Sequence, residues 1–202
     1  MPLKILGLNH NTAPLEIREQ IVFAGPEIPT ALSAVRKLDG IDEAVLLSTC
    51  NRTEFYVVAN DNGHEALKDW LSSSKQLNEG FRDSLFDLED AEAIRHIFRV
   101  ACGLDSMVLG EPQILGQLKD AWRDAQESGA LGSQLGRLMQ HTFSVAKKVR
   151  TDTEIGSSPV SVAYASVHLA QQFFANFKKQ TAILVGAGVT IDLVAKHLKR
   201  KN

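Results

Sequence analysis

Three reactive side chains follow an apolar run within a few residues: the thiol of Cys50, the guanidinium of Arg52 and the carboxylate of Glu54. The thiolate is the form of cysteine that attacks a carbonyl carbon, and a nearby cation such as Arg52 favours that form. Glu54 can pair with Arg52 and fix its geometry, or compete with a substrate carboxylate for it. The spacing indicates a cysteine nucleophile, and the alternative is a half-buried structural cysteine beside an ordinary Arg–Glu pair.

Two apolar segments position these side chains. Residues 44–47 are typical of a buried strand, and residues 55–59 alternate as a second strand. Cys50 is therefore predicted to lie in the connection between two strands. A side chain in such a place is held by rigid structure on both sides and can still reach a ligand.

An earlier strand is predicted to end beside a histidine. Residues 3–8 form a short apolar strand, which residues 9–14 break. Thr12 is placed to cap the helix that follows. His10 stands at the end of the strand, where it either faces the same cleft as Cys50 or satisfies backbone groups of the loop.

The first half of the chain has the element order β-α-α-β-β-α. Helical patterns occupy residues 31–38, ended by Gly40, and a segment after residue 63 that turns Leu67 and Leu71 inward. With three or more strands and helices on one face, this order predicts an α+β fold of ferredoxin-like type.

The second half of the chain is predicted to be mostly helical. Residues 93–101 recur at helix spacing, and His96 lies on the flank of this stripe, where it either leans into a cleft or faces solvent. Residues 103–117 gather three glycines and a proline beside polar side chains, in a place where the backbone can approach a ligand. Further helices are predicted at residues 114–127, 134–151 and 159–177.

Composition and charge are those of an ordinary globular protein, with a net charge of −2. Residues 1–100 carry 10 Lys and Arg against 16 Asp and Glu, whereas residues 101–202 carry 12 against 8. This asymmetry allows a polyanionic partner. Arg137, His141 and Lys148 share one arc of a helix that suits phosphate contact, although such faces are commonly just solvated.

The small number of cysteines and the lack of a recognisable targeting segment predict a cytoplasmic protein. The chain has two cysteines, no apolar signal segment near its start and no run long enough to span a bilayer. We expect no membrane association and no metal site.

The last residues are predicted to begin a dinucleotide-binding unit. Residues 181–185 are typical of a strand that runs into the turn Gly186 to Gly188 and then into a helix. Glycines in such a turn let a pyrophosphate approach backbone N–H groups at the helix N-terminus. The fingerprint is incomplete, because Ile191 stands at its third glycine position.

Five motifs in series resemble those of the glutamyl-tRNA reductase family, and they cover the whole chain in the family's order. They lie at residues 7–14, 47–54, 103–117, 143–156 and 185–188. The resemblance implies an enzyme that opens tetrapyrrole synthesis, the route to porphyrins and heme. Such an enzyme reduces glutamate carried on its tRNA to glutamate-1-semialdehyde with NADPH, through a cysteine thioester.

The same resemblance implies roles for individual residues. Cys50 would be the nucleophile, and His96 matches a histidine considered important for activity, which would assist proton transfer or orient the ester. Arg52 would be the partner of the substrate carboxylate. The residues that would bind the glutamyl group are Thr49, Asn51, Arg52, Ser106, Glu111, Pro112, Gln113 and Gln117. Those of the NADP-binding turn are Gly186, Ala187, Gly188, Val189, Thr190 and Ile191, although the family usually has Glu at the position of Val189.

The resemblance also implies a division into domains. Residues 1–152 would form the catalytic domain, residues 153–180 a linker with a long helix, and residues 181–202 the first βα unit of a truncated Rossmann NADP-binding domain. A lone βα unit cannot close a parallel sheet, so Ile183, Leu184 and Val185 are expected to lack cover.

Partners are implied in the same way. Glutamyl-tRNA would be the substrate, full-length members would be homodimers through a later helical domain, and glutamate-1-semialdehyde aminomutase is an expected partner. Two alternatives stay open. One is a non-reducing fragment that only binds or deacylates glutamyl-tRNA, and the other is a thioester-forming oxidoreductase that acts on a free acyl substrate.

Overall fold

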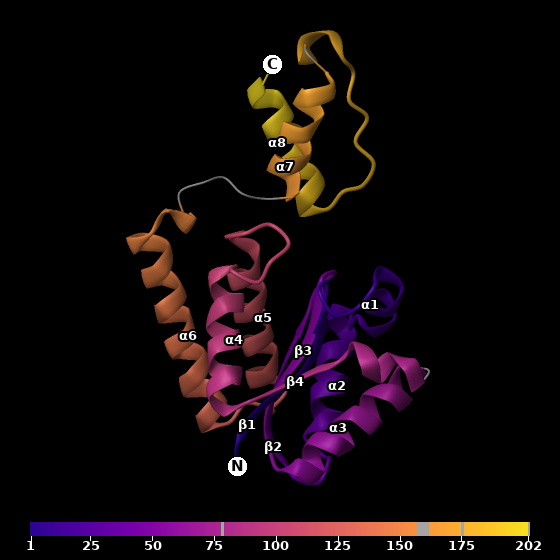
Figure 1. Cartoon of the computed structure of the whole chain (residues 1–202), viewed down its shortest axis with the longest axis vertical. Helices are drawn as coiled ribbons and strands as arrows, with labels where there is room; N and C mark the ends of the chain where they lie inside the picture. Colours follow the sequence, from indigo (N-terminus) through magenta and orange to yellow (C-terminus); the bar gives the residue numbers. More distant parts are fainter. Residues whose placement is uncertain (78, 157–161, 175, 202) are drawn as a thin grey trace.

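The structure, a computed structural model, describes residues 1–77, 79–156, 162–174 and 176–201. Four strands form one sheet (Figure 1): β1 (Leu3–Asn9), β2 (Ile41–Ser48), β3 (Arg52–Ala59) and β4 (Phe86–Glu89). The helices of the described residues are α1 (Leu15–Ile21), α2 (Ile28–Val35), α3 (Asp61–Ser74), α4 (Asp90–Cys102), α5 (Gln113–Glu127), α6 (Ser133–Asp152), α7 (Val162–Phe173) and α8 (Val189–Lys201).

The sheet is antiparallel, with the strand order β2-β3-β1-β4. Strands β2 and β3 form a hairpin, and β1 lies between β3 and the edge strand β4. This connectivity is the split βαβ arrangement of ferredoxin-like sheets, and it confirms the α+β prediction. Strand β4 was not predicted. In it Phe86 and Leu88 alternate with exposed acidic residues, as expected at an edge.

Helices cover both faces of the sheet, with α1, α2 and α3 on one side and α4, α5 and α6 on the other (Figure 1). The helices of the first half of the chain therefore lie on one face, as predicted, and helices of the second half cover the other face. The two central strands need both layers, since every residue of β1 and of β3 is buried. Strands with that many apolar side chains need cover on both faces.

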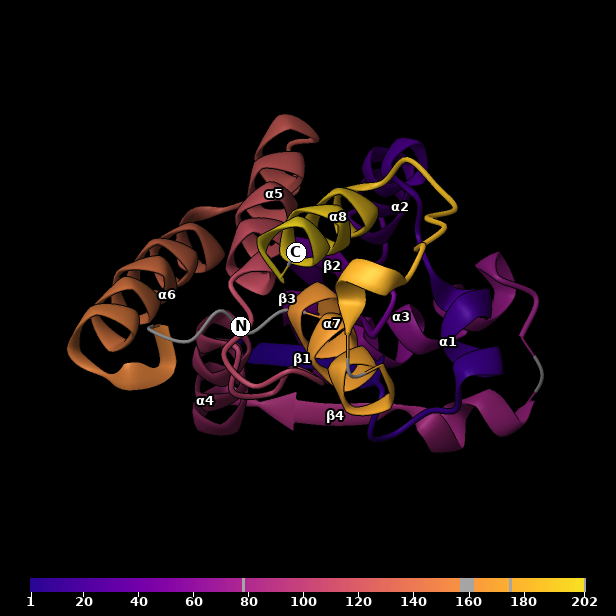
Figure 2. The same cartoon turned by 90° about the horizontal axis from the view of Figure 1, so that it is seen from above.

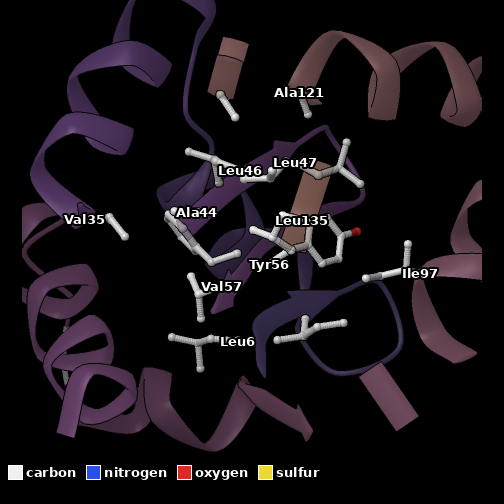
Figure 3. Packing of buried hydrophobic residues seen from close by; sticks show 14 of the residues in the cluster. Leu6, Val35, Ala44, Leu46, Leu47, Tyr56, Val57, Ile97, Ala121 and Leu135 are labelled. Carbon is white, nitrogen blue, oxygen red and sulfur yellow. The ribbon is translucent and has the colours of Figure 1, made fainter. Parts of the chain in front are cut away.

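The core joins the sheet to both helical layers (Figure 3). Leu6 and Val57 of the sheet lie at 0% exposure in one cluster with Val35 of α2 and Ile97 of α4. Replacing a fully buried leucine such as Leu6 by alanine typically costs about 2–5 kcal/mol. This packing fixes the ends of β2 and β3, where the reactive side chains lie.

The first helix begins without a side-chain cap, so the prediction that Thr12 caps it was wrong. The N-cap residue of α1 is Pro14. The Oγ1 of Thr12 instead accepts a hydrogen bond of 3.1 Å from the backbone N–H of Asn9. Thr12 thus closes the turn that leaves β1, two residues too early to cap the helix.

Helices α7 and α8 pack against each other near the end of the chain (Figure 2). The strand predicted at residues 181–185 does not form, because no strand among the described residues lies beside it to offer a hydrogen-bond ladder. Ile183 and Val185 are 85% and 84% exposed, which confirms the predicted lack of cover for these two residues, whereas Leu184 is only 38% exposed and is partly covered. Helix α7 ends at Phe173, short of the predicted residue 177, and its predicted start near residue 159 lies outside the described residues. Within the described ranges, no helix combines the length and apolarity needed to cross a bilayer.

Candidate active site

Cys50 lies at the apex of the turn that joins β2 to β3, and its side chain is exposed. Thr49 holds this turn together. Its backbone N–H donates to the carbonyl oxygen of Arg52 at 2.8 Å. Its Oγ1 accepts from the backbone N–H groups of Asn51 and Arg52, both at 3.2 Å. The hydroxyl of Thr49 thereby fixes the backbone on which the thiol is carried.

Arg18 of α1 supports the same turn from the side. Its Nη1 donates to the carbonyl oxygen of Cys50 at 3.1 Å and to Oδ1 of Asn51 at 3.2 Å. Its Nε donates to the carbonyl oxygen of Ala13 at 3.2 Å, which ties the guanidinium to its own helix entrance. Sequence reasoning missed Arg18, because no pattern links a residue of α1 to a turn 32 positions later.

Arg52, the first residue of β3, is held on two sides although it is only 2% exposed. On the sheet, its Nη1 lies 2.7 Å from Oε1 of Glu54. On the loop between α4 and α5, the same nitrogen lies 3.4 Å from Oδ2 of Asp105, and Nη2 donates to the Asp105 carbonyl oxygen. The predicted pairing of Arg52 with Glu54 is confirmed, and Asp105 is a partner that the sequence did not indicate.

Glu54 is fully buried and its carboxylate is shared by three donors. Oε1 accepts from Arg52, while Oε2 accepts from the hydroxyl of Tyr56 at 2.7 Å and lies 2.9 Å from Nε2 of His96. Burial raises the pKa of Glu54, but the hydrogen bond from His96 and the charge of Arg52 outweigh it and hold that pKa below its usual value. Burial and the charge of Glu54 raise the pKa of Tyr56 well above its usual value.

His96 does not face solvent, and it does not line the cavity beside Cys50. Its side chain is 12% exposed and its ring lies 5.2 Å from that of Phe86 of β4, centroid to centroid. An ionised carboxylate only accepts hydrogen bonds, so the Nε2 of His96 must carry the proton in its contact with Glu54. His96 and Arg52 thus bind the two oxygens of the same carboxylate, and of these two residues only Arg52 lines the cavity.

A second histidine, His10, lies near the same charges. Burial and the positive charge of Arg52 lower its pKa. Its Nδ1 is buried and has no hydrogen-bond partner among the described residues. One of the two predicted roles for His10 was to satisfy backbone groups of the loop, and Nδ1 makes no such hydrogen bond.

A cavity of about 290 Å³ opens beside the Cys50 turn. Among the described residues it is lined by Thr49, Cys50, Asn51, Arg52, Ser106, Met107, Glu111, Gln113, Ile114, Gln117, Val162 and Thr190. The structure thus brings together most of the predicted substrate residues and one residue of the predicted nucleotide turn. The Oγ of Ser106 is buried without a hydrogen-bond partner in the described ranges, and so is available to a ligand.

Other predicted residues lie outside this lining. Pro112 is the N-cap residue of α5 and shapes the entry of that helix. Gly186, Ala187, Gly188 and Ile191 lie before and within the first turn of α8, which begins at Val189. Gly186 has a φ of +123°, a backbone conformation that favours glycine. A glycine turn that opens into a helix N-terminus is the arrangement that binds a pyrophosphate, so these residues could hold a dinucleotide.

The site as a whole is a thiol on a hydrogen-bonded turn, next to a cavity lined by the buried guanidinium of Arg52, the carboxylate of Glu111 and several uncharged polar groups. A two-layered helical cover over an antiparallel sheet holds it. A guanidinium in such a cavity could pair with a carboxylate, and the neighbouring thiol could act as a nucleophile.

Comparison with known proteins identifies the family. The sequence profile described as Glutamyl-tRNAGlu reductase, N-terminal domain, matches residues 6–153. The chain is 58% identical over 198 residues to a glutamyl-tRNA reductase of Stenotrophomonas maltophilia (strain K279a), covering 98% of this chain and 45% of that protein. It is 57% identical over 198 residues, with the same two coverages, to a glutamyl-tRNA reductase of Xanthomonas campestris pv. campestris (strain B100).

A solved structure agrees with the sequence comparisons. Glutamyl-tRNA reductase from Methanopyrus kandleri matches this fold with a TM-score of 0.72 at 32% identity, over 98% of this chain and 47% of that chain. The chain therefore belongs to the glutamyl-tRNA reductase family, as the resemblance of its motifs predicted. It spans a little less than half the length of these relatives.

Proposed function

We propose that this chain forms the substrate-binding and acyl-accepting part of an NADPH-dependent glutamyl-tRNA reductase, the enzyme that starts tetrapyrrole synthesis from glutamate. One observation carries the proposal: the exposed thiol of Cys50 lines the same cavity as the guanidinium of Arg52. A nucleophile and a carboxylate partner in one cavity suit a glutamyl ester, which offers a carbonyl carbon to the first and a carboxylate to the second.

The acyl transfer follows from these two groups. The thiolate of Cys50 attacks the ester carbonyl carbon, a carbon–sulfur bond forms, and the carbon–oxygen bond to the tRNA ribose breaks. The ribose oxygen leaves and takes up a proton from water, and a glutamyl thioester remains on the protein. Arg52 holds the glutamyl carboxylate, while Ser106, Gln113 and Gln117 offer hydrogen-bonding groups to the rest of the ligand.

NADPH, when bound, supplies the hydride that converts the thioester to the aldehyde and releases the thiolate. The residues that would hold it are the turn from Gly186 to Gly188 and the start of α8. Thr190 supports this assignment, because it lines the cavity that contains Cys50. The division of the chain into residues 1–152 for catalysis, residues 153–180 as a linker and residues 181–202 for the start of nucleotide binding is part of the same proposal.

Partners and compartment are proposed on the same basis. The relatives are named for glutamyl-tRNA, which makes that tRNA the proposed substrate. A homodimer, an interaction with glutamate-1-semialdehyde aminomutase and a cytoplasmic location are proposals that rest on the family resemblance.

A second candidate is a chain that binds or deacylates glutamyl-tRNA without reducing it. The exposed residues 181–188, which have no sheet around them, favour this reading for the chain on its own. Hydride transfer needs a positioned nicotinamide, whereas thioester formation needs only the cavity and the turn.

The test is to incubate the chain with glutamyl-tRNA that carries radiolabelled glutamate and to measure label on the protein after denaturation. We expect label on the unchanged chain and none on Cys50→Ser. Cys102→Ser is the matched control, because Cys102 is 3% exposed, lies in the core, and should leave labelling unchanged. Absence of label on the unchanged chain, with tRNA still bound, would contradict the proposal.

A further inference from the structure

The carboxylate of Glu54 connects His96 to Arg52 beneath the cavity. We infer that Glu54 is a positioning residue that aims the guanidinium of Arg52 at the glutamyl carboxylate, and that His96 acts through Glu54 and not as a proton donor to the substrate. This inference rests on the proposed function and goes further, because it assigns a specificity device to residues that do not touch the ligand.

His96 contacts Glu54 and not the cavity. Its Nε2 lies 2.9 Å from Oε2 of Glu54, and it is not among the residues that line the Cys50 cavity. Glu54, at 0% exposure, accepts the hydrogen bond that the Nε2–H of His96 donates. A group whose proton is committed to a buried carboxylate is poorly placed to donate to an ester at the cavity.

Arg52 needs a fixed partner. An arginine side chain has many rotamers, and it recognises a carboxylate only when its planar fork points correctly. Oε1 of Glu54 lies 2.7 Å from Nη1, whereas Oδ2 of Asp105 lies 3.4 Å away and belongs to a loop. The Asp105 backbone carbonyl oxygen accepts from Nη2, so the loop holds one nitrogen of the guanidinium and Glu54 holds the other. Glu54 is the closer of the two carboxylates and the one that is fully buried, so we assign it the aiming of Nη1.

Glu54 is itself held in place. Its side chain extends from the same face of β3 as those of Arg52 and Tyr56, since alternate residues of a strand share a face. The hydroxyl of Tyr56 and the Nε2 of His96 both bind Oε2, which leaves Oε1 free for Arg52. Loss of His96 removes the donor that comes from outside β3, so the carboxylate can rotate and the guanidinium loses its orientation.

Specificity gives a readout that a purely structural role would not change. A guanidinium that is aimed correctly distinguishes a carboxylate from the neutral amide of the same size. The probes are therefore the same tRNA charged with glutamate or with glutamine. The measurement is the rate of label transfer to Cys50 as a function of the concentration of each charged tRNA.

The decisive pair of variants is His96→Gln and His96→Phe. A glutamine amide can replace the Nε2–H donor to Glu54 but cannot act as an acid, whereas phenylalanine can do neither. We expect the unchanged chain and His96→Gln to prefer glutamate to glutamine by about tenfold or more. In His96→Phe the half-saturating concentration of glutamyl-tRNA should rise roughly tenfold, with a smaller change in maximal rate, and the preference should fall toward one.

Two controls separate this result from misfolding. Alkylation of Cys50 by iodoacetamide should proceed at similar rates in all variants, because the turn around Cys50 does not contact His96. Glu54→Gln should reproduce the loss of preference seen in His96→Phe. Tyr56→Phe should keep more of the preference than His96→Phe, because the hydroxyl comes from the same strand as Glu54.

The inference is overturned if His96→Gln loses maximal rate as severely as His96→Phe while the preference for glutamate survives, since His96 would then be acting as an acid. It is also overturned if the preference is unchanged in His96→Phe. Absence of label from glutamyl-tRNA on the unchanged chain would instead refute the proposed function as well, so the two failures are distinguishable.

Discussion

We expect Asp105 to compete with the proposed glutamyl substrate for Arg52, so that its removal tightens binding of the glutamyl group. Its Oδ2 lies 3.4 Å from Nη1 and 3.5 Å from Nη2 of Arg52, while its Oδ1 lies 4.0 Å from Nη2 of the half-exposed Arg99. These distances are longer than the about 2.7–2.9 Å of a strong charge-assisted bond. The Asp105 carboxylate is therefore a partner that a substrate carboxylate can displace.

The size of the effect follows from this geometry. The side chains of Arg52 and Asp105 are 2% and 19% exposed but their contacts are long, so we expect the Asp105 carboxylate to contribute about 1 kcal/mol, the usual net size of one hydrogen bond. One kcal/mol corresponds to a factor of about five in affinity. We expect Asp105→Asn to lower the half-saturating concentration of glutamyl-tRNA for labelling of Cys50 about fivefold. The backbone carbonyl oxygen of residue 105 remains as an acceptor for Arg52.

The matched control is Asp120→Asn, which removes one exposed carboxylate from α5 and changes the net charge equally. Its half-saturating concentration should stay within about twofold of the unchanged chain, because exposed pairs contribute little. If Asp105→Asn weakens binding while Asp120→Asn does not, Asp105 positions Arg52 or the substrate and does not compete.

Three further predictions follow from the same contacts. Arg18→Gln should lower the rate of acyl transfer to Cys50 roughly tenfold, because the turn loses its support at the Cys50 carbonyl oxygen; an unchanged rate would show that the turn is rigid without it. Gly7→Ala should lower the free energy of unfolding by about 1–3 kcal/mol in urea titrations, since the added Cβ would lie 2.8 Å from Cγ of Glu54; an unchanged midpoint would contradict the packing. Glu54 has a lowered pKa in the folded chain, so the stability that its ionised form contributes is present at neutral pH and is lost as pH falls through its folded pKa. The unfolding midpoint of Glu54→Gln, measured by urea titration from pH 7 to pH 3, should depend less on pH than that of the unchanged chain, and equal slopes would contradict this sign.

The hairpin that carries Cys50 could be predicted from sequence, because its two strands are strongly apolar and a polar segment separates them. The pairing of Arg52 with Glu54 was also within reach, since residues two apart share a face of a strand. The same rule points to Tyr56, four residues after Arg52, which sequence reasoning overlooked.

The rest of the site depends on tertiary packing that leaves no local signal. His96 reaches Glu54 because α4 packs on the sheet, and Asp105 reaches Arg52 because the loop after α4 folds back. The error over residues 181–185 has a different cause. Their composition favours a strand, but a strand forms only where a neighbour supplies hydrogen bonds.

The presence of helices on both faces of the sheet could also be predicted in part from the sequence. Residues 3–8 and 55–59 are apolar at nearly every position, which indicates burial on two sides instead of one. The sequence analysis interpreted residues 55–59 as a strand of alternating inward and outward side chains, whereas the run is apolar at nearly every position. The number of helices in the second half then supplies the second layer.

The most direct test of acyl transfer to Cys50 is the intact mass of the chain after brief reaction with glutamyl-tRNA and acid quenching. We expect a mass increase of one glutamyl group, located at Cys50 by peptide mapping and removed by neutral hydroxylamine, as a thioester is. An unmodified mass under conditions in which the tRNA is bound, or a glutamyl group on any residue other than Cys50, would contradict it.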